Sequence, residues 1–417
     1  MRMNKKKIVP KLRFPEFGTS EGWKKYKLRE LADRITKKVG DNKLVTLSIS
    51  AGIGFVSQAE KFSRDISGKQ YCNYIYLKKG EFSYNKGNSK TFPQGCIYEL
   101  KEYDEAAVPN AFISFRFKEN LVPSFYQGYF DSNFHGKQLV RFITSGARSD
   151  GLLNISPTDF FSIVLPTPVK KEEQQKIADC LSSIDDLIDA ESRKLKALEK
   201  YKKGLMQKLF PAEGKTLPEW RFPEFQGCGE WKSKSIGKAC KMFSGGTPDT
   251  SKKKFYGGTI PFIRSAEINK SSTELFITEE GFKNSSAKMV KKGDILIALY
   301  GANSGEVALS KIDGAINQAI LCLRHETNNV FVYHYFNHMK NWIISKYIQG
   351  GQGNLSGQII KSVNLYFPKA EEQQKIADFL SEIDTMITGQ SNKVEQLKAH
   401  KKGLMQGLFP SLEEADV

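Results

Sequence analysis

Three short segments of this 417-residue chain occur twice, and this duplication constrains the fold more than any other feature. The pairs are Glu172–Asp179 with Glu371–Asp378, Lys202–Gln207 with Lys401–Gln406, and Arg13–Phe17 with Arg221–Phe225. The first two pairs are 199 residues apart (172 to 371, 202 to 401), and the third is 208 residues apart (13 to 221). Between these segments the two halves hardly match. The pattern predicts a duplicated scaffold that holds two different binding modules at a set separation.

Two long helices are predicted over residues 170–209 and 369–408. Apolar residues recur in each at alternating steps of four and three, which places one seam along a helix and is typical of coiled coils. Acidic residues open each helix, basic residues lie near its end, and both suit the helix dipole. The seam residues are Ile177, Leu181, Ile184, Ile188, Leu195, Leu198 and Leu205, then Ile376, Leu380, Ile383, Ile387, Val394, Leu397 and Leu404. The polar residues at the two interrupted steps of each seam are Glu191 and Lys202, then Gln390 and Lys401.

The matching interruptions favour pairing of the two helices with each other. The alternative is that each helix packs on its own globular block. An Arg-Phe-Pro-Glu-Phe segment follows the first helix, and its only other copy is residues 13–17 near the N-terminus. If both copies have equivalent surroundings, the second helix ends beside residues 13–17, and the helices are antiparallel. At about 1.5 Å per residue they form a rod of about 57 Å. The globular blocks are then related by a pseudo-two-fold axis.

The expected fold class is α+β, with two globular mixed α/β blocks separated by the antiparallel helices. The predicted limits are 1–165 for the first block, 166–211 for the first helix, 212–366 for the second block, 367–411 for the second helix and 412–417 for a tail. Pro211 and Pro410 stop the helices. The candidate strands are Leu44–Ser50, Ala111–Phe117, Asp294–Tyr300 and Ala319–Leu323.

The charge of the chain favours a polyanionic partner. There are 63 basic and 46 acidic residues, a net charge of +17, which suits nucleic acid or an anionic membrane surface. No apolar run approaches the ~18–20 residues that span a bilayer. The start, Met1–Lys7, lacks the apolar core of a signal peptide. We therefore expect a cytoplasmic protein that binds nucleic acid.

Motifs for catalysis and for metal binding are not found. The six cysteines form no C-x-x-C pair, and His334 and His338 have no further ligands at a suggestive spacing. There is no phosphate-binding G-x-x-x-x-G-K-[ST] loop, no complete G-x-G-x-x-G and no G-x-S-x-G. No methyltransferase or nuclease motif is evident. We predict neither a catalytic residue nor a metal site.

Several segments interleave basic, amide and aromatic residues, as contacts to phosphates and base edges require. In the first block they lie in three stretches, the last of them just before the first helix. The candidate DNA-binding residues there are Lys69, Tyr71, Tyr84, Asn85, Lys86, Asn88, Lys90, Arg148 and Ser149. In the second block the candidates are Lys252, Lys253, Lys254, Tyr256, Arg264, Tyr300, Asn303, Ser304, Gln352 and Asn354. For each segment alone, the alternative is an ordinary solvated loop.

The chain resembles the specificity subunit of type I restriction-modification enzymes over nearly its whole length. The motifs that carry the resemblance include Glu-Gln-Gln-Lys-Ile-Ala at 173–178 and 372–377. The second block adds Phe243–Pro248, Ile260–Ile263, Gly293–Ile297 and Ala315–Gln318. The first block departs from this pattern. Where the second block has Gly293-Asp294, the first has Gly80-Glu81-Phe82, and it lacks the Gly-Gly-Thr-Pro turn.

The resemblance implies that each block is a target recognition domain that reads one half of a bipartite, asymmetric DNA sequence. The paired helices act as a spacer and dock two methyltransferase (modification) subunits, and restriction subunits join through the complex. The specificity subunit itself is not catalytic. S-adenosylmethionine, ATP and Mg²⁺ belong to the partner subunits, which methylate adenine N6 and cleave DNA. The alternatives are an architectural coiled-coil adaptor that joins two protein partners, and a self-sufficient nuclease or methylase.

Overall fold

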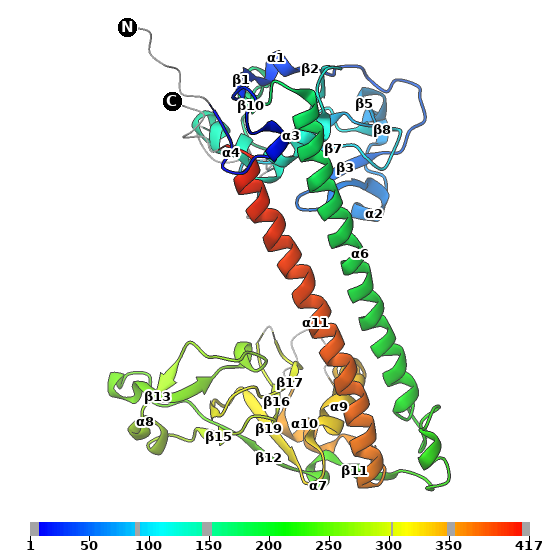
Figure 1. The fold of residues 1–417 in the computed structure, drawn as a ribbon. Coiled ribbons are helices and arrows are strands. Elements are labelled where there is room, and N and C mark those ends of the chain that lie inside the picture. Colours follow the sequence, from blue (N-terminus) through cyan, green and yellow to red (C-terminus); the bar gives the residue numbers. More distant parts are fainter. Residues whose placement is uncertain (1–7, 88–91, 144–151, 302, 348–354, 411–417) are drawn as a thin grey trace. The chain divides into compact units, whose positions relative to one another are not determined.

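The computed structural model describes residues 8–87, 92–143, 152–301, 303–347 and 355–410 (Figure 1). The chain forms two compact units. Unit 1 comprises Met1–Glu191 and Lys393–Val417, and unit 2 comprises Ser192–Asn392. Each unit therefore contains one globular block and one half of each long helix. The predicted limits treated the helices as separate segments, whereas the compact units divide both helices between them.

Unit 1 contains a four-stranded antiparallel sheet of order β2-β9-β6-β7 and three two-stranded sheets, β1-β10, β3-β4 and β5-β8. Its strands are β1 (Lys24–Lys27), β2 (Ala32–Arg34), β3 (Leu47–Ser50), β4 (Gly54–Ser57), β5 (Ile75–Lys78), β6 (Phe82–Asn85), β7 (Cys96–Glu99), β8 (Glu105–Val108), β9 (Ile113–Phe117) and β10 (Val164–Thr167). Its helices are η1 (Pro15–Phe17), α1 (Leu28–Leu31), α2 (Gln58–Phe62), η2 (Gly68–Asn73), α3 (Pro123–Asp131), α4 (Phe134–Leu139), η3 (Val140–Phe142) and α5 (Pro157–Phe160).

Unit 2 contains a four-stranded sheet of order β12-β19-β16-β17, a second of order β14-β13-β18-β15, and the pair β11-β20. Its strands are β11 (Lys232–Ser235), β12 (Cys240–Ser244), β13 (Tyr256–Ile263), β14 (Phe276–Ile277), β15 (Lys288–Val290), β16 (Ile295–Ala298), β17 (Val307–Leu309), β18 (Gly314–Ile316), β19 (Ile320–His325) and β20 (Asn364–Phe367). Its helices are η4 (Pro223–Phe225), α7 (Ile236–Ala239), η5 (Lys253–Phe255), η6 (Ser265–Glu267), α8 (Glu279–Lys283), α9 (Asn329–Tyr347) and α10 (Gly357–Ser362).

The two blocks share a topology although their sequences hardly match. In both, an antiparallel pair joins the first strand of the block to the last, β1 with β10 and β11 with β20. Both have a four-stranded antiparallel sheet in which corresponding strands occupy corresponding positions. The four candidate strands are confirmed as β3, β9, β16 and β19, with shifts of up to three residues at their ends. Their apolar residues fill the cores of the two units, and the largest core of unit 1 is richer in aromatic residues than that of unit 2.

The long helices α6 (Lys171–Leu209) and α11 (Ala370–Leu408) each have 39 residues and confirm the predicted ranges to within one residue. Every predicted seam residue is buried or half-buried. In each unit, halves of α6 and α11 lie side by side (Figure 1), the start of one against the end of the other. Antiparallel pairing is thus confirmed within each unit. The alternative, that each helix packs on its own globular block, also holds in part. Ile177 and Leu181 belong to the core of the block that precedes α6.

The deduction that α11 ends beside the N-terminal segment is confirmed. The amide of Leu12 donates to the carbonyl oxygen of Gly407 at 2.8 Å. At the equivalent place in unit 2, the amide of Trp220 donates to the carbonyl oxygen of Lys208 at 2.9 Å. The duplicated segments therefore have equivalent surroundings.

The lysines at the polar steps form ion pairs between the helices. Lys401 pairs with Asp185 at 2.6 Å in unit 1, and Lys202 pairs with Asp384 at the equivalent place in unit 2. Apolar seams alone tolerate sliding and reversal, whereas matched polar groups within a seam specify register. These pairs therefore fix the antiparallel alignment. None of the described helices is long and apolar enough to cross a membrane.

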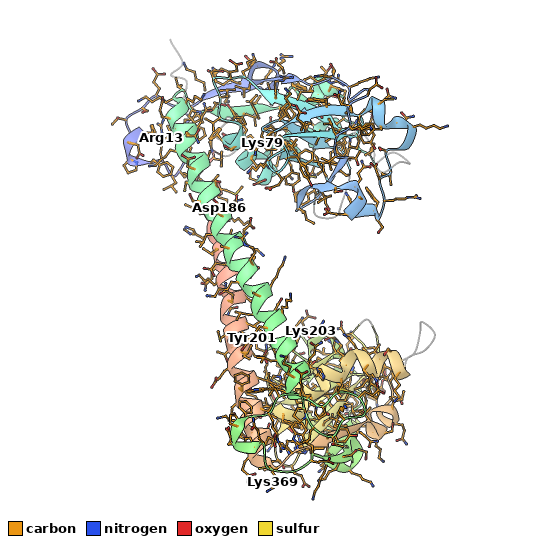
Figure 2. The ribbon with its side chains drawn as sticks, turned by 90° about the vertical axis from the view of Figure 1, so that its right-hand side faces the viewer. Arg13, Lys79, Asp186, Tyr201, Lys203 and Lys369 are labelled. Carbon is orange, nitrogen blue, oxygen red and sulfur yellow. The ribbon has the colours of Figure 1, made fainter. Side chains whose placement is uncertain are left out.

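We expect Asp384→Ala to reduce the free energy of unfolding by about 1–2 kcal/mol, because it leaves the half-buried Lys202 ammonium without its partner. Lys203→Ala is the matched control, since Lys203 is the exposed neighbour on α6 (Figure 2). Urea denaturation of both variants measures the difference. Equal effects of the two substitutions would contradict a register role for Lys202.

A buried histidine beside this pair predicts a pH dependence. His334 is 1% exposed, with Nε2 3.8 Å from Asp384, and burial followed by the charge of Lys202 lowers its pKa from 6.5 to about 3. The unfolded chain therefore takes up the proton first as the pH falls. Stability that is present above pH 6.5 is lost progressively toward pH 3, by up to about 1.4 kcal/mol per pH unit. Denaturation between pH 4 and 7 should show a shallower slope for His334→Gln and an unchanged slope for the exposed His400→Gln.

Candidate nucleic-acid-binding surfaces

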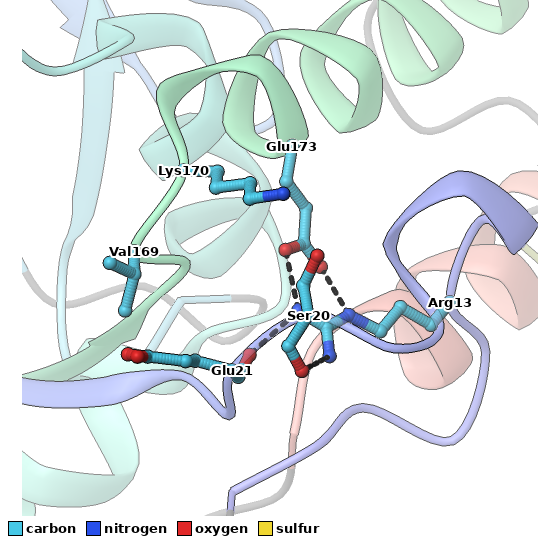
Figure 3. Close-up of a pocket in the computed structure, with 6 residues that line it drawn as sticks. All are labelled: Arg13, Ser20, Glu21, Val169, Lys170 and Glu173. Atoms are coloured by element: carbon cyan, nitrogen blue, oxygen red, sulfur yellow. Dashed lines mark hydrogen bonds and ion pairs between the residues drawn. The ribbon is translucent and has the colours of Figure 1, made fainter.

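The duplicated segments of each unit meet in a buried ion pair, which we call the clasp. In unit 1 the guanidinium of Arg13 donates two hydrogen bonds of 2.7 Å to the carboxylate of Glu173 (Figure 3). This carboxylate also accepts from Trp23 Nε1 at 3.0 Å. Arg13 also donates to the carbonyl oxygens of Ser20 and Glu21. A cavity of about 200 Å³ adjoins the pair.

Unit 2 repeats the clasp with Arg221 and Glu372, at 2.7 and 2.6 Å. The hydrogen bonds that Arg221 donates to the Glu372 carboxylate raise the pKa of Arg221. The glutamine after each clasp glutamate also has an internal role, because Gln174 and Gln373 donate to Pro168 and Pro368. The duplicated motifs thus hold the structure together, so the residues that bind a ligand must be sought in the divergent parts.

In unit 1 the structure corrects the prediction for Tyr84. This residue is fully buried, stacks on Phe160 at 4.7 Å and donates its hydroxyl hydrogen to Gln94, so it is a core residue. Tyr71 is half-buried, and its hydroxyl group forms hydrogen bonds with the main chain of Asn42 and Leu44. These bonds stabilise the loop before β3.

Of the other unit 1 candidates, Lys69 is exposed on η2 and Lys86 is half-buried. Asn85 accepts from the amide of Gly87 at 2.9 Å and donates to Ile49 at 3.4 Å, so its side chain shapes the turn after β6. Asn88, Lys90, Arg148 and Ser149 lie outside the described residues.

In unit 2 the lysine run Lys252–Lys254 is exposed at η5, and Lys254 forms an ion pair with Glu280. Tyr256 is half-buried and donates to the carbonyl oxygen of Pro248 at 2.7 Å. Arg264 is held by two carboxylates, Glu267 and Glu274. The guanidinium lowers the pKa of Glu267 to about 2. Arg264 thus has an internal partner on each side.

The remaining unit 2 candidates follow β16. Tyr300 is 39% exposed, and Ser304 donates its hydroxyl hydrogen to the carbonyl oxygen of Leu299 at 2.9 Å. Asn303 is half-buried and lines a hollow of about 370 Å³. Gln352 and Asn354 lie outside the described residues.

The hollow contains two residues that the sequence did not single out. Asn269 and Lys270 follow η6, are exposed, and line the same hollow as Asn303 and the buried Ile268, Val307 and Ala308. No motif marks them. Their relevance comes from the packing of η6 against β16, which brings two distant loops together.

The Gly-Gly-Thr-Pro turn of unit 2 is explained by close packing. A Cβ atom on Gly245 would lie 1.7 Å from the carbonyl oxygen of Ile316, and one on Gly246 would lie 1.8 Å from Ser286 Oγ. Only glycine fits such an approach. The next residue, Thr247, donates to Gln318 at 2.7 Å. The motif thus anchors the end of β12 on β18.

No group of three or more histidine, cysteine, aspartate or glutamate side chains suited to a metal ion occurs among the described residues. The basic, amide and aromatic groups that are exposed can bind phosphates and base edges. The exposed groups of both blocks are thus of the kinds that contact nucleic acid.

Comparison with known proteins identifies the family. The type I restriction modification DNA specificity domain matches residues 20–200 and again 229–399, so the chain belongs to this family. The members of this family are specificity subunits, which are not themselves catalytic. Each match covers one globular block and most of the long helix that follows it.

Individual relatives agree. A Methanocaldococcus jannaschii protein provisionally assigned as the MjaX type I specificity subunit is 28% identical over 302 residues, 70% of this chain and 68% of that one. An Escherichia coli type I specificity subunit is 29% identical over 169 residues, 38% of this chain and 42% of its own length. The crystal structure of the S subunit from M. genitalium shares the fold, with a TM-score of 0.63, 16% identity and coverage of 97% of this chain and 100% of that chain.

The clasp predicts a local loss of stability in each unit. Glu372→Ala leaves the guanidinium of Arg221 buried without its counter-charge, which costs about 3–5 kcal/mol. Hydrogen exchange should rise first in β11 and β20, and Glu173→Ala should have the same effect on β1 and β10. The matched controls are Glu371→Ala and Glu172→Ala at the exposed neighbours. A clasp variant that exchanges like its control would exclude this role.

Proposed function

We propose that the chain is the DNA-sequence specificity subunit of a type I restriction-modification complex and binds a bipartite, asymmetric double-stranded target. The observation that carries this proposal is the pair of blocks with one sheet order and one clasp but different exposed residues. Two equivalent frames with different surfaces suit two different half-sites. The net charge of +17 suits the phosphate backbone of DNA.

The proposal assigns one modification subunit to each unit. Leu187 on α6 in unit 1 is 43% exposed, and Met386 on α11 in unit 2 is 56% exposed. These residues occupy equivalent positions of the repeat, 199 residues apart (187 to 386). Exposed apolar residues at equivalent sites support two like partners. Restriction subunits join through the complex, and S-adenosylmethionine, ATP and Mg²⁺ belong to these partners. We place the complex in the cytoplasm, where cellular DNA is accessible.

The helices are proposed to set the distance between the half-sites. Half-sites on one face of DNA are about 34 Å apart, one helical turn. Both α6 and α11 run without a break through residues of both units. A covalent link between the two blocks makes the second contact intramolecular, so affinity depends on both half-sites.

The second candidate is an architectural adaptor that joins two proteins without reading DNA. The exposed apolar residues on the helices favour it, because they suit protein partners. It does not explain why the two blocks differ in their exposed basic and amide residues.

Methylation mapping tests the proposal. The chain, expressed with its modification subunits, should direct methylation to one two-part sequence. Exchange of residues 217–366 for the block of another family member should change one half-site only. Binding to the target should weaken about 10³- to 10⁵-fold between 50 and 200 mM salt, for about 6–10 phosphate contacts. Methylation or binding without sequence preference would contradict the proposal and favour the architectural adaptor instead.

The spacer role makes a separate prediction. Insertion of four residues after both Ala190 and Gly389, which are equivalent in the repeat, adds about one turn, or about 6 Å, to both helices. The required gap between half-sites should grow by about 1–2 base pairs while both half-site sequences stay the same. Methylation mapping reads out the gap. An active variant with an unchanged gap would rule out the spacer role.

A further inference from the structure

The hollow beside β17 has a composition that suits recognition of a base pair. Its floor includes Ile268, Val307 and Ala308, which are 4%, 8% and 6% exposed. Asn269, Asn303 and Lys270 also line the hollow, and their side chains carry two amides and one ammonium group. A small apolar floor with a few polar groups at its rim is the usual composition of a specific binding site.

The polar groups in and around this hollow divide into two classes. The first class forms ion pairs within the unit. Arg264 pairs with Glu267, and Glu306 pairs with Lys340 at 2.6 Å. By contrast, no partner among the described residues engages the side chains of Asn269, Lys270 or Asn303. The carboxylates that would repel DNA are thus paired, while the amides and one cation remain available.

The main chain at Asn303 is held by hydrogen bonds within its turn and to β16. The carbonyl oxygen of Asn303 accepts from the amide of Glu306 at 2.9 Å, and the amide of Gly305 donates to Ala298 at 2.8 Å. Gly305 has a φ of +84°, and a Cβ atom there would lie 2.9 Å from the Ile344 side chain. This position therefore requires glycine.

Asn269 and Lys270 are positioned by the buried Glu267. Its carboxylate accepts from Arg264, from the hydroxyl of Thr273 at 3.0 Å and from the amide of Glu274 at 3.1 Å. The carbonyl oxygen of Glu267 accepts from the amide of Lys270 at 2.9 Å. Glu267 is thus a positioning residue, and it closes the loop that presents both side chains.

We propose that Asn269 and Asn303 are the specificity-determining residues of unit 2, which hydrogen-bond base edges of its half-site, while Lys270 contacts a phosphate. This inference rests on the proposed function and assigns it to particular atoms. Asparagine amides pair most favourably with the N6 and N7 atoms of adenine in the major groove. Hydrogen bonds hold the main chain at both loops, which lowers the cost of ordering these loops on binding.

The test uses the full chain with its modification subunits. Asn269→Ala and Asn303→Ala should each lower discrimination at one position of the unit 2 half-site by about tenfold to a hundredfold. The half-site of unit 1 should stay the same. Competition binding with single-base variants of the target, and methylation mapping, measure both. Lys270→Ala should leave the recognised sequence unchanged and lower the salt slope of binding by about one.

The matched control is Asn341→Ala, which removes an exposed amide from α9 in the same unit, outside the hollow. It should leave discrimination unchanged. The inference is overturned if Asn269→Ala and Asn303→Ala retain wild-type discrimination, or if they weaken all sequences equally. A wild-type complex without any sequence preference would instead refute the proposed function, so the two failures are distinguishable.

Discussion

The buried guanidinium–carboxylate clasp is the interaction on which each unit depends. It joins the segment before a block to the helix after it, so the entry and exit of the block are fixed at one place. The antiparallel strand pair beside it, β1-β10 or β11-β20, continues the same closure. Because both ends are fixed, the loops between them can differ freely. One frame thus carries two unrelated surfaces.

The sequence predicted the helices and their direction because these depend on long, regular patterns. A seam of apolar residues that runs from Ile177 to Leu205, and again from Ile376 to Leu404, leaves little choice of structure. The duplicated Arg-Phe-Pro-Glu-Phe segment added direction, since equivalent segments need equivalent neighbours. The central strands were predicted for a similar reason. The order of the strands in the sheets could not be predicted from the sequence, because strand pairing depends on contacts between distant residues.

The binding residues were harder to predict, for physical reasons. Tyr84 lies in a strand where aromatic and polar residues alternate, and that pattern does not reveal whether an aromatic ring faces the core. Arg264 was predicted to be available for binding DNA, although Glu267 three residues later could have indicated a local ion pair. Asn269 carries no local signal, because it comes to line one hollow with Asn303 only after η6 packs on β16.

The division of both helices between the units has a consequence for synthesis on the ribosome. Unit 2 is one continuous stretch, Ser192–Asn392, and is complete as soon as that stretch emerges. Unit 1 lacks Met405, Leu408 and Phe409 from its core until the last part of the chain is made. Domains usually fold from the N-terminus during translation. Here the first block to be made is the last to be completed, and its open core must meanwhile be protected from aggregation.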